Sequence, residues 1–105
     1  SKQAKIALRI AEWEADDNRF KLKNKVEELQ RQARMQREGL DYYEKAALNE
    51  ARELHRSALL KYEESEVDIA GLVQSLNAAR DIRKGYIEAV YAYNISLLEL
   101  ELYTE

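Results

Sequence analysis

The segment Lys61 to Asp68 separates two long stretches of helical apolar spacing, and this single interruption limits what the chain can fold into. Upstream, apolar side chains recur at steps of three and four without any proline. Downstream, the spacing restarts at Ile69 and continues to Leu100. The sequence therefore predicts an all-α fold, a long antiparallel two-helix coiled-coil hairpin with helices over about 4–62 and 68–103 and a turn over about 63–67.

Two apolar stripes follow each other along the first predicted helix. The shorter one is interrupted by Asp17 and consists of Ile6, Ile10, Trp13 and Phe20. The longer one begins two residues out of phase and consists of Leu22, Val26, Leu29, Ala33, Gln36, Leu40, Tyr43, Ala47, Ala51, Leu54, Ala58 and Tyr62. Consecutive steps of four near its end shift the repeat from seven toward eleven residues, which predicts a straighter helix.

Gly39 lies within the longer stripe. A glycine costs about 1 kcal/mol against alanine inside a helix, but no other turn-forming residue stands beside it. We therefore expect the helix to continue through Gly39, and a break at that residue is the alternative.

The second predicted helix carries a regular stripe in which only Arg83 is out of character. Its members are Ile69, Leu72, Leu76, Ala79, Arg83, Tyr86, Val90, Tyr93, Leu97 and Leu100. A second apolar line runs beside it through Val73, Ile87, Tyr91, Ile95, Leu98 and Leu102. Such a wide apolar arc predicts more than one neighbouring helix. We expect the two helices to pack through Leu54, Ala58, Ile69, Leu72, Leu76, Tyr86, Val90, Tyr93 and Leu97.

The start of the second helix has two possible caps. Ser65 with Asp68 gives the S-x-x-D pattern of a capping box, and Asp68 can instead be the N-cap residue itself. In both cases the acidic residues lie at the positive end of the helix dipole.

The two predicted helices differ in length. At 1.5 Å per residue the first is about 90 Å long and the second a little over 50 Å. Pairing from the turn leaves roughly the first twenty-five residues without a partner in the chain, by this rise per residue. We expect another helix, from a longer parent protein or from a second copy, to cover this part.

The composition excludes several classes of function. The charged fraction is 35% and the net charge −3, which disfavours nucleic-acid binding despite seven tyrosines. No uncharged apolar run is long enough to span a membrane. With no cysteine and one histidine, His55, we expect no enzyme, no catalytic or metal site and no cofactor.

The segment from Leu59 to Glu101 resembles the closing helical hairpin of the TolC-like outer membrane efflux proteins. The residues that carry the resemblance are Tyr62, Val67, Ile69, Leu72, Val73, Leu76, Ala79, Tyr86, Ile87, Ala89, Tyr93, Asn94, Leu97 and Leu100. The opening SKQAKIALRIAEWE is similar to the start of the descending helix in that family. The ending YNISLLELELY is closest to the heavy-metal and cation efflux branch.

The resemblance implies a structural role in transport. Members are trimers whose hairpins form a periplasmic tunnel below a membrane barrel, within a tripartite pump. The chain, residues 1–105, would be one hairpin of such an outer-membrane protein, without barrel strands, in the periplasm of a Gram-negative-type envelope. Its partners would be further copies, a periplasmic adaptor and the inner-membrane pump. The adaptor would contact the tip of the hairpin, Tyr62, Glu63, Glu64, Ser65, Glu66, Val67 and Asp68.

The chain departs from the family pattern in the turn. Ser65 stands where members usually have glycine, and Val67 and Gln74 replace a charged pair that closes the tunnel in some members.

Tyr62 is either an aromatic of the tunnel mouth or the last core residue of its helix. The three glutamates of the turn are read either as a solvated turn or as a cation funnel. The alternative function is an autonomous dimeric coiled-coil scaffold.

Overall fold

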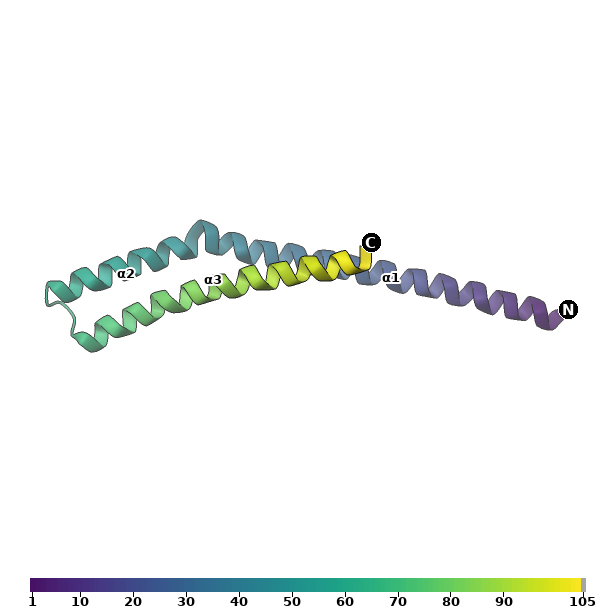
Figure 1. Cartoon of the computed structure of the whole chain (residues 1–105), viewed down its shortest axis with the longest axis horizontal. Coiled ribbons are helices and arrows are strands. Elements are labelled where there is room, and N and C mark those ends of the chain that lie inside the picture. The colour runs from purple at the N-terminus through teal and green to yellow at the C-terminus, as the bar shows by residue number, and fades with distance from the viewer. Residues whose placement is uncertain (105) are drawn as a thin grey trace.

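The chain folds into one long helical hairpin, and the computed structural model describes residues 1–104 (Figure 1). The outgoing rod consists of α1 (Lys2–Tyr42), the π-helical segment η1 (Tyr43–Ala47) and α2 (Leu48–Glu63), and α3 (Ile69–Thr104) returns along it. The molecule measures 92 × 22 × 14 Å. No strand occurs among residues 1–104. The predicted all-α hairpin is confirmed, with helix ends within two residues of those expected.

The longer predicted stripe forms the core of the outgoing rod. Its six buried members are Leu29, Ala33, Leu40, Ala47, Ala51 and Ala58, and α3 adds Leu72 and Ala79. Most of these residues are alanines, so the backbones of the two rods approach closely. Ser96 is buried as well, and its hydroxyl donates to the Tyr93 carbonyl oxygen at 2.7 Å. This local bond satisfies the hydroxyl, which explains how a polar residue outside the predicted stripes enters the interface.

The rod is not a continuous α-helix. In η1 the N–H of Leu48 donates to the carbonyl oxygen of Tyr43, five residues back, and the rod bends there (Figure 1). This wider turn accommodates an extra residue and coincides with consecutive steps of four, at Tyr43, Ala47 and Ala51. The structure therefore corrects the expectation of an unbroken α-helix over 4–62. The chain does continue through Gly39, as predicted, because the irregularity begins only after Tyr42.

Residues 2–24, which we term the N-terminal arm, extend beyond the end of α3 (Figure 1). Residues 1–25 are all exposed, and the first half-buried side chain belongs to Val26. Lys25, at the base of the arm, places its ammonium 5.7 Å from the centre of the Tyr103 ring. The predicted difference in length between the two helices is confirmed, and no part of residues 1–104 buries the N-terminal arm.

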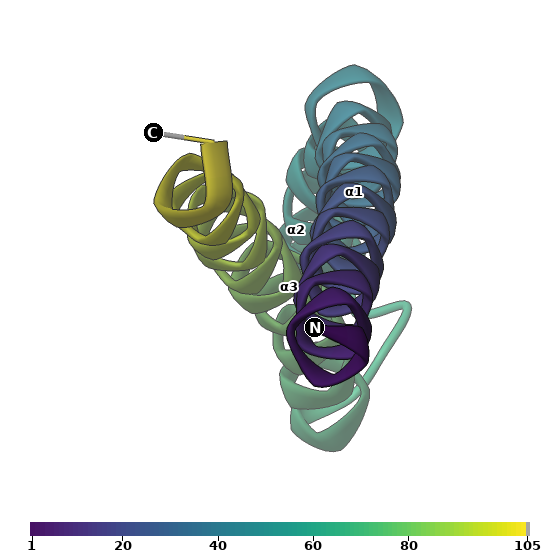
Figure 2. The same cartoon turned by 90° about the vertical axis from the view of Figure 1, so that its right-hand side faces the viewer.

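The two rods cross at an angle. Seen from the N-terminal end, α3 diverges from α1 toward its C-terminus (Figure 2). The second apolar line of α3 lies outside the interface along most of the helix, including its start at Val73. Its exposed members are Val73, Ile87, Tyr91, Leu98 and Leu102.

Candidate docking tip

The tip of the hairpin begins with a well-formed helix end. The N–H of Glu66 donates to the carbonyl oxygen of Lys61 at 2.8 Å, and the N–H of Ser65 donates to that of Tyr62 at 3.1 Å. This pair of bonds is the Schellman motif, which satisfies two of the last free carbonyl groups of a helix. Ser65 takes the left-handed conformation of this motif, with φ at 61°. The serine in place of glycine therefore keeps the glycine-type turn.

We predict that Ser65→Gly stabilises the hairpin. A residue with a Cβ pays about 1 kcal/mol or more for a left-handed conformation, and glycine pays no such penalty. The free energy of unfolding in urea should rise by about 1 kcal/mol. Glu63→Gly is the control, because it places glycine inside α2 and should lower stability. A loss of stability in Ser65→Gly would contradict the turn geometry.

Asp68 is the N-cap of α3. Its carboxylate Oδ1 accepts a hydrogen bond from the N–H of Gly71 at 2.8 Å, and its carbonyl oxygen accepts one from the N–H of Leu72 at 3.0 Å. Of the two caps that the sequence left open, the structure shows the second. Ser65 takes no part in capping α3, because its left-handed conformation belongs to the end of α2.

Removing the Asp68 carboxylate should fray the start of α3. Asp68→Ala leaves the Gly71 N–H without its acceptor, and such N-cap losses cost about 1 kcal/mol. Amide hydrogen exchange near Gly71 and Leu72 should quicken, and thermal stability should fall. Glu66→Ala is the matched control, since its carboxylate makes no hydrogen bond among residues 1–104. Equal losses in the two variants would exclude the capping role.

The surface of the tip is acidic and open. A shallow groove of about 600 Å³ is lined by Tyr62, Glu63, Ser65, Glu66, Val67 and Asp68. Tyr62 is 42% exposed, so it belongs to the surface of the tip more than to the core. Within residues 1–104, none of the four tip carboxylates, including that of Glu64, forms an ion pair. Their negative field is therefore available to a basic partner.

The predicted packing residues occupy a range of burial. Ala58 and Leu72 are buried, whereas Ile69 is 59% and Leu97 40% exposed at the two ends of α3. The half-buried members are Leu54, Leu76, Tyr86, Val90 and Tyr93. Ile69 and Leu97 are therefore less covered than the residues between them, a difference that apolar spacing alone does not show.

A second surface feature escaped the sequence prediction. A groove between α2 and α3, of about 580 Å³, is lined by Leu48, Arg52, His55, Arg56, Leu59 and Arg83. The only sign of this groove in the sequence was Arg83, the one charged residue in the apolar stripe of the second predicted helix. The groove contains no carboxylate, and Arg56 turns to Glu53 on its own helix. His55 is thus surrounded by cations and not by metal ligands.

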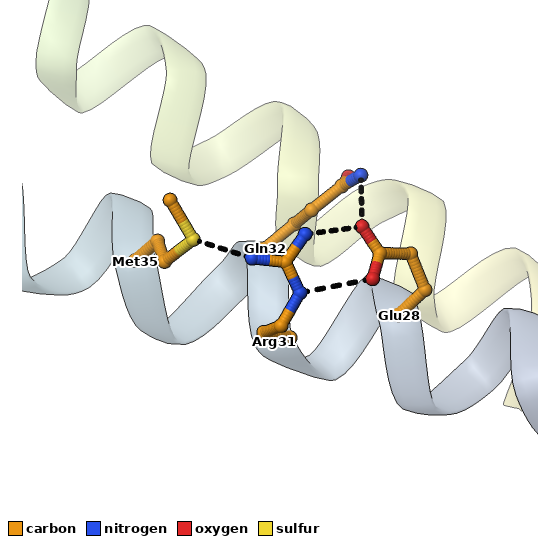
Figure 3. Close-up of polar contacts among 4 residues, drawn as sticks. All are labelled: Glu28, Arg31, Gln32 and Met35. Carbon is orange, nitrogen blue, oxygen red and sulfur yellow. Dashed lines mark hydrogen bonds and ion pairs between the residues drawn. The ribbon is translucent and has the colours of Figure 1, made fainter.

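The most connected polar cluster has a structural role. Arg31 donates to both carboxylate oxygens of Glu28, Gln32 donates to one of them, and Arg31 also reaches the sulfur of Met35 (Figure 3). The hydrogen bonds from Arg31 and then Gln32 lower the pKa of Glu28. All four residues lie on one helix at steps of three and four, so the cluster stabilises α1 and forms no ligand site.

The described part of the chain offers no group of three or more potential metal ligands. None of the helices within residues 1–104 combines the length and apolarity needed to cross a membrane.

In comparisons with known proteins, no family model, curated protein or solved structure matches the chain. The features that bear on function are therefore the acidic tip, the uncovered arm and the exposed line of α3.

Proposed function

We propose that the chain is a helical hairpin of a periplasmic efflux duct in a tripartite pump and docks a periplasmic adaptor through its tip. The resemblance to TolC-like outer membrane efflux proteins supplies the family, the trimeric parent, the envelope location and the heavy-metal or cation branch. The proposal treats the chain as a segment that packs beside other helices and itself catalyses nothing.

One observation carries the proposal furthest. The hairpin ends in an ordered turn that presents Tyr62 and four carboxylates at the extreme end of a 92 Å rod, and none of these carboxylates forms an ion pair within residues 1–104. The Schellman motif and the Asp68 cap fix the backbone of this turn, so its side chains are presented on a rigid support. A partner with basic residues at its own tip would match this surface in charge.

The exposed apolar faces also support an assembled state. The second line of α3 leaves Ile87 66% and Tyr91 69% exposed, in a helix whose other face is packed. Contiguous exposed apolar surface of this kind marks interaction sites. In a duct, neighbouring hairpins would cover this line.

The test is binding to the isolated helical hairpin of a tripartite-pump adaptor. The full chain with Tyr62→Ala, and separately with Glu63→Lys and Glu66→Lys together, should bind at least about tenfold more weakly, a change of about 1.4 kcal/mol. Glu12→Lys with Glu14→Lys makes the same charge change on the N-terminal arm and should leave binding intact. If the tip variants bind as well as the parent chain does, the tip is not the docking surface.

The second candidate function is a dimeric coiled-coil scaffold. The observation that favours it is Trp13, which is 83% exposed on an apolar face that residues 1–104 leave uncovered. A scaffold would bury this face in a stable dimer, whereas a duct hairpin would leave it to other parts of the assembly.

A further inference from the structure

The N-terminal arm and the C-terminal half of α3 present two uncovered apolar lines of the same length. The arm exposes Ile6, Ile10, Trp13 and Phe20 by 53–83%, and α3 exposes Ile87, Tyr91, Leu98 and Leu102 by 55–80%. Ile6 to Phe20 spans about 21 Å and Ile87 to Leu102 about 22 Å along a helix. Each line therefore offers the other an apolar strip to bury, and the strip of the arm is interrupted by Asp17, whose carboxylate pairs with Lys21.

The charges beside the two lines are complementary. The charged residues of the arm fall into three successive groups, basic, acidic and basic. These are Lys2, Lys5 and Arg9; Glu12, Glu14, Asp16 and Asp17; and Arg19, Lys21 and Lys23. Along α3, Glu88 is followed by ten uncharged residues and then by Glu99 and Glu101, with no basic residue from Gly85 to Thr104. The acidic centre of the arm would therefore face only uncharged residues.

The ion pairs of the described residues leave these charges available. Lys5, Arg9, Glu88, Glu99 and Glu101 form no salt bridge within residues 1–104. Arg19 and Lys21 pair only with carboxylates of their own helix, in exposed contacts that are individually weak. A partner helix can replace such contacts at little cost.

An arm cannot reach the α3 line of its own chain, because it points away from the end of α3 (Figure 1). We infer that the arm of one copy packs on the C-terminal half of α3 in a second copy, and that the exchange is mutual. The contact is an interaction surface for a second copy of this chain and does not rest on the proposed duct function. The tip lies at the opposite end of the molecule and stays free.

Symmetry selects the orientation of the exchanged arms. A closed two-fold dimer in which each arm covers the other copy's α3 requires the two hairpins to point in opposite directions, which makes the arm parallel to the α3 it covers. Placing Ile6 level with Ile87 then sets Lys5 and Arg9 on either side of Glu88. The same alignment sets Lys21, which flanks the apolar line of the arm, level with Glu101. An antiparallel contact would instead propagate from copy to copy without closing.

Oligomeric state and tryptophan fluorescence test the inference on the full chain. We expect a dimer by sedimentation, with the emission of Trp13, the single tryptophan, shifted to shorter wavelength as the protein concentration rises. Glu99→Lys with Glu101→Lys should weaken the dimer at least about tenfold. Lys21→Glu, added to that variant, should restore part of the lost affinity. Glu63→Lys with Glu64→Lys is the control of equal charge change at the tip and should leave the dimer intact.

Cross-linking tests the orientation, since residues 1–104 contain no cysteine. A chain with Ile6→Cys and Ile87→Cys should give a covalent dimer with a short bismaleimide, whereas Ile6→Cys with Leu102→Cys should not cross-link. A monomer with exposed Trp13 at all concentrations would overturn the inference, and so would a trimer or a cross-linked ladder from the second pair. The dimer and the duct packing cover the same line of α3 and are alternatives, whereas adaptor binding at the tip is measured separately, so failure of the dimer and failure of tip docking are distinguishable.

Discussion

Gly85→Ala should destabilise the hairpin by about 1–3 kcal/mol, the usual cost of overpacking a filled site. A Cβ on Gly85 would clash with the Tyr43 hydroxyl and would lie 3.0 Å from Cζ of that ring. The ring is held between two aromatic neighbours, with its centre 5.7 Å from that of Tyr42 and 6.3 Å from that of Tyr86. Because Tyr43 has little room to move, the clash should outweigh the better helix propensity of alanine.

Gly39→Ala is the matched control, because the substitution is the same and its surroundings are not. Apart from its chain neighbours and the backbone of its own helix, no atom of residues 1–104 lies within 4 Å of a Cβ built on Gly39, so this variant should gain about 0.5–1 kcal/mol from helix propensity alone. Urea unfolding at one fixed protein concentration measures both variants. In a Tyr43→Leu background, Gly85→Ala should cost much less. An equal cost with and without the tyrosine ring would refute the proposed contact.

Leu29→Ala should lower the free energy of unfolding by about 2–4 kcal/mol. Leu29 is the largest fully buried side chain among residues 1–104, at 1% exposure, and it lies on the face of α1 that also buries Ala33 and Leu40. Truncation removes its apolar surface and leaves a cavity between rods that alanines already hold close together. Urea denaturation followed by helical circular dichroism gives the value.

Leu22→Ala is the control for this prediction. Leu22 lies near the base of the N-terminal arm and is 49% exposed, so its truncation should cost less than about 1 kcal/mol of unfolding free energy in the monomeric hairpin. Comparable losses in the two variants would mean that Leu29 is not an anchor of the interface.

The sequence predicted the hairpin well because the spacing of apolar residues determines both which segments are helical and which side of each helix is buried. Residues such as Leu40 and Ala51 fall on the buried side of a helix whatever the details of packing, and they are buried. The uncovered arm also followed from sequence, since helix length depends only on residue number. These predictions needed no knowledge of how side chains fit together.

The rest depends on contacts between residues distant in sequence. The close approach of Gly85 to Tyr43 and the basic groove beside Arg83 exist only once α3 lies along the outgoing rod. The choice between Ser65 and Asp68 as a cap required backbone angles, because both residues have suitable side chains. The turn between the helices was located correctly, whereas its role as a docking tip and its partner are matters of resemblance and stay predictions.

The π-helical turn at Tyr43–Ala47 has a consequence for how chains of this kind can change in length. A turn that holds one residue more than an α-helical turn absorbs an insertion locally, so the faces of α1 and α2 stay aligned toward α3. Losing one residue there would restore ordinary α-helical geometry without rotating the tip relative to the arm. A related chain one residue shorter at this place would keep the same docking end and the same lateral surface.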